Sequence, residues 1–267
     1  MNYIGSKYKL SAFLLQNIEH AIKRCGAKPL DESIFCDLFA GTSAVGRLFK
    51  NRAKQVISND REFYSFVLAK NYIQNSKELI RVRKLLELLD NENTTLIQEG
   101  KIYKYYALGG GENRQYFSDE NAKKIDSIRI QIKAWKDDDF INEEEYFFLL
   151  ASLLESADKV ANTASVYGAF LKTLKKTAQK KLVLKPADFE ISENTHIVFN
   201  EDSNILIKQI RGDILYLDPP YNTREYGANY HLLNSIALYD DFVPRGKTGL
   251  REYEKSNWCK KAKVYEW

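Results

Sequence analysis

The sequence has few of the residues that mark secreted, membrane-bound or metal-dependent proteins. It contains three cysteines in 267 residues, and Cys25, Cys36 and Cys259 share no spacing typical of a metal site. We expect them to be reduced thiols in a reducing compartment. No apolar stretch reaches the length that spans a membrane, and the charged start MNYIGSKYKL is not a secretion signal. These absences predict a cytoplasmic protein with no metal site and no membrane segment.

Neither the charge nor the composition of the chain is extreme. Forty Lys and Arg residues against 36 Asp and Glu residues give a formal net charge of +4, which is compatible with nucleic-acid binding but does not establish it. Hydrophobic residues make up 44% and charged residues 28% of the chain, as in ordinary globular proteins. The length suits one large α/β domain or a core domain that carries an insertion.

Two separated parts of the chain have the alternating pattern of a parallel α/β sheet. Residues 33–39 and 55–60 have the pattern of strands, each followed by a helical pattern, and a helix is predicted over 8–24. Strand-like stretches return at 196–199 and 213–217, separated by a short helical pattern. This rhythm predicts a doubly wound sheet whose strands come from both parts.

A long segment between these two parts is mostly helical by pattern. Ser118 and Asn142 are candidate N-caps of two helices, and Glu145 completes a capping box for the second. Residues 103–114 (YKYYALGGGENR) contain three tyrosines followed by three glycines, which predicts a mobile loop. We expect a catalytic domain in two parts, interrupted by a helical insertion, with these bounds: residues 1–75, 76–195 and 196–267.

A glycine-rich turn, DLFAGTSAVG over residues 37–46, leads from the first strand into a helix. Glycines there let backbone amides approach a ligand. The turn lacks the middle glycine of the dinucleotide fingerprint, and Arg47 and Leu48 stand where a phosphate loop needs lysine and a hydroxyl residue. Asp60 ends the next strand, where a carboxylate can bind a ribose diol. Taken alone, the turn fits either a nucleoside-like ligand or a helix entry that binds nothing.

The stretch ILYLDPPYNTREY, residues 214–226, begins with an apolar run of the kind that fills the middle of a parallel sheet. Proline cannot donate to a sheet ladder, so Pro219 and Pro220 end the strand beside Asp218. The Asp218 carboxylate and the Pro219 carbonyl can accept the two protons of an aryl amine, which frees its lone pair. Tyr221 can stack on a base that is turned out of a duplex. The alternative is a turn acid followed by a core ring.

Four segments together resemble the D12 class of DNA adenine methyltransferases, the family of the Dam enzymes. They are NYIGSK (2–7), DLFAGTSAVG (37–46), ND (59–60) and DPPY (218–221), in this order. The resemblance spans the whole chain, and the insertion is characteristic of a subgroup of the family. It implies a Rossmann-like, S-adenosylmethionine-dependent α/β methyltransferase fold, with the insertion as the target-recognition part. It also implies transfer of a methyl group to N6 of adenine in double-stranded DNA, within a restriction–modification system that includes a cognate endonuclease.

The resemblance also assigns the site residues. Those at the catalytic motif would be Asp218, Pro219, Pro220 and Tyr221. Those that bind the cofactor would be Tyr3 and Lys7 at its methionine end, Asp37 near its amino group, Asp60 at its ribose, Asp202 at its adenine amine, Phe39 and Gly41 in the glycine turn, and Asp218 again. The family commonly has tryptophan where this chain has Tyr3, and tyrosine keeps a flat ring face.

The insertion contains a basic stretch. From Lys159 to Lys185 there are seven lysines and no acid. Such a run is ordinarily a solvated helix face, which is the alternative here, but beside a base-binding site it predicts contact with phosphates. The segments 103–115 and 222–231 are further candidates for DNA contact. The predicted DNA-binding residues are Lys172, Lys175, Lys176, Lys180, Lys181, Arg224 and Tyr226.

Two other functions stay open from the sequence. DPPY has close variants in enzymes that methylate amines of RNA adenine or of DNA cytosine at N4. The chain could also be a nucleic-acid-binding fragment without activity of its own. Methyl transfer to duplex DNA, single strands or RNA would distinguish these functions.

The region that follows DPPY lacks an expected feature. Residues 222–267 contain no β-branched apolar strand, whereas three more strands follow in the fold that the chain resembles. We therefore expect that the C-terminal strands are missing and that the DPPY strand is an unpaired sheet edge. We also expect that a complementing C-terminal segment would restore solubility and activity.

Overall fold

The computed structural model describes residues 3–91, 97–220 and 225–253. It divides into two compact units. The sheet unit consists of Gly5–Glu78 and Asp188–Pro219. The helical unit consists of Met1–Ile4, Leu79–Ala187 and Pro220–Trp267. The functional division expected at residues 75/76 and 195/196 stays a prediction, since compactness alone does not define a recognition domain.

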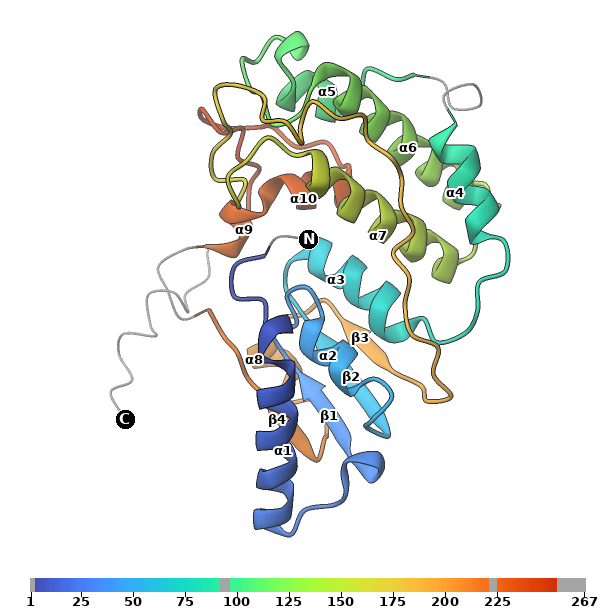
Figure 1. Cartoon of the computed structure of the whole chain (residues 1–267), viewed down its shortest axis with the longest axis vertical. Helices are drawn as coiled ribbons and strands as arrows, with labels where there is room; N and C mark the ends of the chain where they lie inside the picture. The colour runs from blue at the N-terminus through green and yellow to red at the C-terminus, as the bar shows by residue number, and fades with distance from the viewer. Residues whose placement is uncertain (1–2, 92–96, 221–224, 254–267) are drawn as a thin grey trace. The chain divides into compact units, whose positions relative to one another are not determined.

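The sheet unit is built on four parallel strands in the order β3-β2-β1-β4 (Figure 1). The strands are β1 (Ile34–Asp37), β2 (Gln55–Asn59), β3 (Ile197–Phe199) and β4 (Ile214–Tyr216), which confirms the four predicted strands. The order reverses at β1, because β2 lies on one side of it and β4 on the other. In open α/β sheets, ligands bind at such a switch point, outside the carboxyl ends of the strands.

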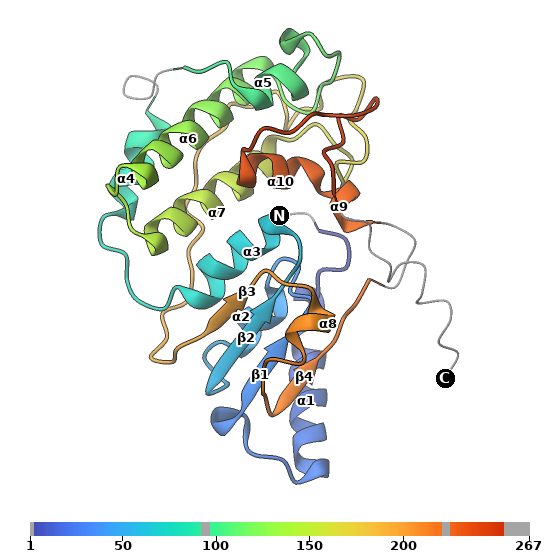
Figure 2. The same ribbon diagram turned by 180° about the vertical axis from the view of Figure 1, so that it is seen from behind.

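Helices cover the sheet unevenly. Helix α2 (Ala44–Phe49) packs on one face, where the rings of Phe35 and Phe49 stack with centroids 4.1 Å apart. Gly46 of α2 allows Ile73 to pack closely against this helix, since an added Cβ would lie 2.9 Å from Cδ1 of Ile73. The short helix α8 (Ser203–Leu206) lies on the face away from α2 (Figure 2). The other helices of the unit are α1 (Ser11–Cys25) and α3 (Phe63–Ala69), which continues as a π-helical turn over Lys70–Gln74.

Strand β4 forms an edge of the sheet within the described part of the chain. Leu215 is 48% exposed and Leu217 is 51% exposed, so the apolar pattern typical of a central strand belongs here to an edge strand. The helix predicted over 8–24 is confirmed as α1. It is poorly covered, because none of its residues is buried and Phe13 is 61% exposed.

The helical unit contains two long helices, α6 (Asp119–Asp137) and α7 (Glu143–Val160), together with shorter ones. Ser118 caps α6 by accepting a hydrogen bond from Asn121 N, and Asn142 and Glu145 form the predicted capping box of α7, so both predicted caps are confirmed. The shorter helices are α4 (Val82–Asp90), α5 (Lys101–Tyr106), α9 (Tyr226–Asn229) and α10 (His231–Leu238). No helix in the described ranges combines the length and the apolarity needed to span a membrane.

The prediction of a mobile loop at residues 103–114 is wrong. The stretch contains the end of α5 and a 3₁₀ turn over Leu108–Gly110, and the Tyr106 side chain is fully buried. The Arg114 guanidinium is also buried and donates hydrogen bonds to the carbonyl oxygens of Tyr105, Gly246 and Lys247. Buried anchors therefore fix this glycine-rich segment.

The expectation of a mostly helical insertion fails after Val160. Residues 161–187 contain neither helix nor strand. Asn162 organises the start of this segment, because its side-chain amide donates to the carbonyl oxygens of Gln115 and Leu171, both at 2.9 Å, and its Oδ1 accepts from Lys175 N at 3.0 Å. An irregular backbone that is held by a buried amide has no periodic sequence pattern, so the sequence could not predict this segment.

Candidate active site at the carboxyl ends of the strands

Asp37 ends β1 and is a buried acid without a hydrogen-bond partner. Its side chain is 1% exposed, and neither carboxylate oxygen has a hydrogen-bond partner among the described residues. Burial, together with the negative charges of Asp60 and Asp218, raises the pKa of Asp37 to about 7. The backbone amides of Phe39 and Gly46 oppose this shift, although neither meets hydrogen-bond geometry. Unpaired buried carboxylates are costly and rare, which indicates a group that receives a ligand.

The glycine turn is held against the end of β2 by Asp60. Gly41 has a φ of 54°, which favours glycine, and its N–H donates to Asp60 Oδ2 at 2.7 Å. Asp60 Oδ1 accepts from Glu62 N at 2.9 Å. Burial raises the pKa of Asp60, although these backbone hydrogen bonds oppose the shift. Each oxygen keeps a second lone pair, so the predicted contact with a ribose diol stays chemically possible.

Ser43 is a site residue that sequence reasoning did not find. It lies in the glycine turn with a φ of 61°, a conformation that is strained for any residue with a Cβ. Its side chain is fully buried, and its hydroxyl has no hydrogen-bond partner in the described structure. Ser58, the register partner of Asp37 across β1 and β2, is also fully buried, and its hydroxyl also has no hydrogen-bond partner among the described residues. Strain and unpaired buried polar atoms gather at functional sites, and no sequence pattern signals them.

Asp218 follows β4 and is ion-paired with Lys7. The Lys7 ammonium contacts Asp218 Oδ2 and also donates to the carbonyl oxygen of Gly5 at 3.0 Å. Their side chains are 17% and 24% exposed, respectively. The pair joins the N-terminal lysine motif to DPPY across 211 positions of sequence. Pro219 and Pro220 are half-buried, and Tyr221 lies outside the described residues.

Asp202 acts as a helix cap in this structure. Its Oδ1 accepts from Asn204 N at 2.8 Å at the start of α8, and its Oδ2 lies 3.5 Å from the Arg61 guanidinium. Hydrogen bonds from Asn204 lower the pKa of Asp202. Asn59 fixes the neighbouring loops, because its amide donates to Leu38 O and accepts from Glu201 N. Contact between Asp202 and an adenine amine stays a prediction.

Tyr3 and Tyr226 lie together in the helical unit. Tyr3 stacks on Tyr230 with ring centroids 4.6 Å apart, and Tyr226 stacks on the same ring at 6.1 Å. The Tyr226 hydroxyl donates to the carbonyl oxygen of Ile4, and Ile4 N donates to the Tyr230 hydroxyl at 2.7 Å. A residue predicted for the cofactor and one predicted for DNA thus share one aromatic cluster.

The predicted DNA-binding lysines differ in their surroundings. Lys175 is half-buried, and its ammonium donates to the carbonyl oxygen of Thr163 at 2.7 Å. Because residues 161–187 contain no helix, the alternative of a solvated helix face is wrong for six of the seven lysines, and only Lys159 lies on a helix, in the last turn of α7. Arg224 lies outside the described residues. The exposed members of the set are Lys172, Lys176, Lys180 and Lys181.

The described residues contain no group of three or more side chains that could hold a metal ion. Cys25 is an exposed free thiol and Cys36 a buried one. Burial raises the pKa of the Cys36 thiol to about 11. The unpaired Asp37 carboxylate at the end of β1 and the Asp218 carboxylate after β4 suit a ligand with a cationic group and hydrogen-bond donors.

Comparisons with known proteins agree with this chemistry. A family model described as D12 class N6 adenine-specific DNA methyltransferase matches residues 3–266. The type II methyltransferase M.NlaIII of Neisseria lactamica is 60% identical over 264 residues, which cover 99% of this chain and 77% of that protein. M.FokI of Planomicrobium okeanokoites is 42% identical, over 99% of this chain and 41% of that protein.

M.CviAII of Paramecium bursaria Chlorella virus 1, also named a type II methyltransferase, is 40% identical over 99% of this chain and 77% of that protein. No solved structure has a significant match. The family match covers nearly the whole chain and includes all four motifs. The chain therefore belongs to the D12 class N6 adenine-specific DNA methyltransferase family.

Proposed function

We propose that the sheet unit binds S-adenosylmethionine at the switch point between β1 and β4 and methylates N6 of a target adenine in duplex DNA. The observation that carries this proposal is the buried, unpaired Asp37 carboxylate, which ends the strand next to the one that Asp218 follows. A carboxylate there can bind the ammonium group of the cofactor's methionine part. The negative charges of Asp60 and Asp218 also favour a cationic ligand.

The remaining polar groups fit the rest of this cofactor. We assign the buried Ser43 hydroxyl to its carboxylate, and the second lone pairs of Asp60 to its ribose hydroxyls. The other residues assigned to the cofactor are Tyr3, Lys7, Phe39, Gly41 and Asp202. When bound, the cofactor supplies a methyl group that is already activated by its sulfonium centre.

Asp218 and Pro219 act on the target amine in this proposal. Lys7 engages Asp218 Oδ2, so Oδ1 is the oxygen assigned to accept a proton of the adenine amine. The carbonyl oxygen of Pro219 accepts the other proton, and the fixed φ of Pro219 and Pro220 holds both acceptors in place. Such preorganised acceptors stabilise the positive charge that develops on the nitrogen. Once the nitrogen has become cationic, Asp218 Oδ1 can take its proton.

Duplex DNA is the proposed macromolecular substrate, with Tyr221 stacking on the extruded base. Relatives named type II methyltransferases and modification methylases support a restriction–modification context with a cognate endonuclease. We propose the cytoplasm as the place of action, because the substrate is DNA.

Strand β4 is also proposed to pair with a further strand. Among the described residues β4 has no strand on one side, and its edge with the half-exposed Leu215 and Leu217 forms a surface of the kind that sheets cover or pair. The proposed partner is a complementing C-terminal segment. Added as a separate polypeptide, such a segment should raise the Tm and the methyl-transfer rate of the chain.

The test of cofactor binding is calorimetric titration of S-adenosylmethionine into the chain and into Asp37→Asn. We expect Asp37→Asn to weaken binding at least about tenfold, since hydrogen bonds to charged groups contribute about 1.5–3 kcal/mol. Asp213→Asn is the matched control, because Asp213 precedes β4 at the opposite end of the strands and binds Ile34 N and Lys28. If the two substitutions weaken cofactor binding equally, Asp37 does not belong to the cofactor site.

A further inference from the structure

One segment of the helical unit alternates buried and exposed side chains like a strand but pairs with no strand among the described residues. We call residues 180–187 the strap. Leu182 and Leu184 are buried, whereas Val183 is 54% exposed and both Lys181 and Lys185 are exposed. This two-residue period places the lysines on the outer side of the strap.

Side chains of three helices replace the missing neighbouring strand. Leu182 N donates to Asn121 Oδ1 of α6 at 2.7 Å, and Leu184 N donates to Asp90 Oδ1 of α4 at 2.9 Å. Two serines of α7 accept the next amides: Ser156 Oγ from Lys185 N and Ser152 Oγ from Ala187 N, both at 3.0 Å. Each amide that is held in this way fixes one residue of the strap.

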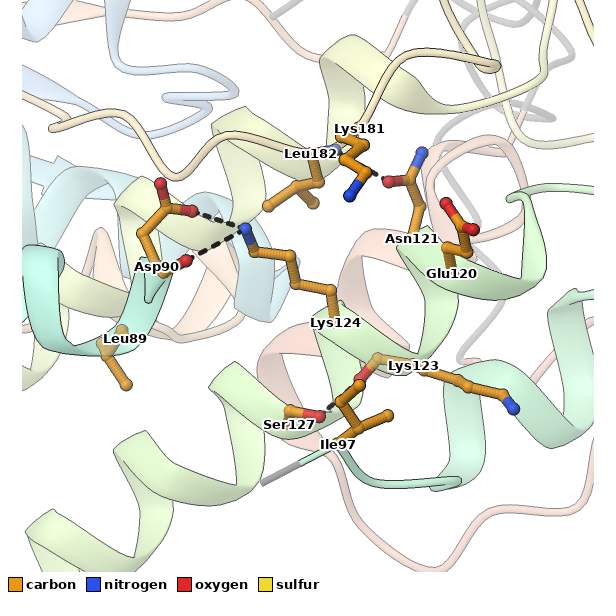
Figure 3. A pocket seen from close by; sticks show the side chains of 10 residues that line it. All are labelled: Leu89, Asp90, Ile97, Glu120, Asn121, Lys123, Lys124, Ser127, Lys181 and Leu182. Atoms are coloured by element: carbon orange, nitrogen blue, oxygen red, sulfur yellow. Dashed lines mark hydrogen bonds and ion pairs between the residues drawn. The ribbon is translucent and has the colours of Figure 1, made fainter. Parts of the chain in front are cut away.

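The side chains that hold the strap are themselves fixed. Asn121 also donates through Nδ2 to the carbonyl oxygen of Lys180 at 2.9 Å. Its side-chain amide therefore binds the backbone of the strap at both neighbours of Lys181, Lys180 and Leu182. Asp90 is paired with the Lys124 ammonium at 2.8 Å. Figure 3 shows these groups beside a cavity of about 350 Å³, with Lys181 and Leu182 on one side and Asp90 on the other. Hydrogen bonds to four side chains therefore hold the backbone of the strap without a partner.

We propose that the strap is a preformed contact surface for the phosphate backbone of duplex DNA, with Lys181 and Lys185 as the contacting residues. This inference rests on the proposed DNA substrate. Asn121 and Asp90 act as positioning residues, because they hold the backbone from which the lysines project. A partner that meets a prearranged surface avoids the entropy cost of ordering it.

The spacing and charge of the strap fit a polyanion. Four residues of extended chain place the two lysines on the order of 13 Å apart, and each DNA strand carries one phosphate per about 3.4 Å of axis. In the adjoining cavity Lys123 is paired with Glu99 and Lys124 with Asp90, so the positive charge offered to a partner is that of the strap lysines. Lys175, in contrast, donates to the carbonyl oxygen of Thr163. We therefore do not assign a phosphate contact to Lys175.

The test is the salt dependence of binding of the full chain to a fluorescently labelled duplex. Lys181→Ala combined with Lys185→Ala should lower the slope of log Kd against log salt by about 1.8, at about 0.9 for each phosphate that is no longer neutralised. Lys84→Ala combined with Lys133→Ala is the matched control, because it removes two exposed lysines of α4 and α6 and should leave the slope nearly unchanged. Equal slopes for both double variants, or no binding of duplex DNA by the wild-type chain, would overturn the inference.

The positioning role has its own readout. Asp90→Ala should raise the KM for DNA several-fold at an unchanged kcat, and Asp90→Asn should restore most of the loss, because its oxygen still accepts from Leu184 N. Equal KM values for the two variants would contradict the role of Asp90. Methyl transfer by the wild-type chain is measured separately. If the wild-type chain transfers methyl groups but the lysine variants keep its salt dependence, only the inference about the strap is refuted. If the variants change the salt dependence but the wild-type chain transfers no methyl groups, only the proposed function is refuted.

Discussion

Two buried acids, one in each unit, have opposite surroundings. Asp126 of the helical unit is fully buried and accepts hydrogen bonds from the backbone amides of Gly100, Ile102 and Tyr103 and from the Tyr239 hydroxyl. Asp37 of the sheet unit is equally buried but has no hydrogen-bond partner among the described residues. Burial raises the pKa of both carboxyls. A raised pKa alone therefore does not distinguish an acid that supports the fold from one that awaits a ligand, whereas the hydrogen-bond partners do.

The largest expected effect concerns Asp218, which follows β4, the strand that pairs with β1. Asp218→Ala should lower methyl transfer by at least about 10²-fold, the usual loss for one preorganised electrostatic group. The fold should persist, because Asp218 follows an edge strand and its side chain is partly exposed. Transfer of tritiated methyl groups to duplex DNA, with circular dichroism as the control for folding, measures both. A variant that keeps a tenth of the activity would contradict the role of Asp218.

The second prediction tests the comparison itself by removing each acid in turn. Asp126→Ala leaves three amides at the start of α5 without their acceptor, so the free energy of unfolding should fall by about 3 kcal/mol or more. Asp37→Asn removes a buried charge that nothing pairs, so its Tm should not fall. Thermal melting of both variants, without added cofactor, decides the matter. If Asp37→Asn melts well below the wild-type chain, Asp37 supports the fold after all.

The sequence predicts what depends on local spacing. The four strands and the caps at Ser118 and Asn142 follow from residues within a few positions of one another. The Lys7–Asp218 pair joins residues 211 positions apart, and the strap depends on three helices, so neither leaves a periodic pattern. The family resemblance assigned both Lys7 and Asp218 to the site, but it did not predict the ion pair between them.

The glycines of the segment 103–114 show why composition misled. An added Cβ on Gly110 would collide with the carbonyl oxygen of Tyr103, and one on Gly109 would collide with the Asp119 carboxylate. These glycines permit close packing. Glycine has two uses, flexibility and close approach, and only the fold shows which one applies.

The last prediction concerns pH and follows from the unpaired state of Asp37. Because its pKa lies near 7 in the folded chain against an ordinary value of 3.8, Asp37 takes up a proton as the pH falls below 7. A cationic ligand needs the charged form, so the affinity for S-adenosylmethionine should be highest between about pH 7 and pH 8. It should fall toward tenfold per unit below pH 7 as Asp37 takes up a proton, and fall again above about pH 8 as the amino group of the cofactor loses its own. Titration calorimetry between pH 6 and pH 9 measures this dependence.

The raised pKa of Asp37 also affects the stability of the fold, which it favours at low pH, whereas cofactor binding is favoured at higher pH. A carboxyl whose folded pKa is raised favours the folded state at low pH, and this contribution is lost as the pH rises from about 4 to about 7. Cofactor binding and stability should therefore respond to Asp37 in opposite directions over that window. Asp37→Asn should flatten the stability profile between about pH 4 and pH 7 and the binding profile below pH 7, whereas Asp213→Asn should leave the binding profile unchanged. A wild-type affinity that does not vary with pH would mean that Asp37 does not bind the cofactor's cationic group.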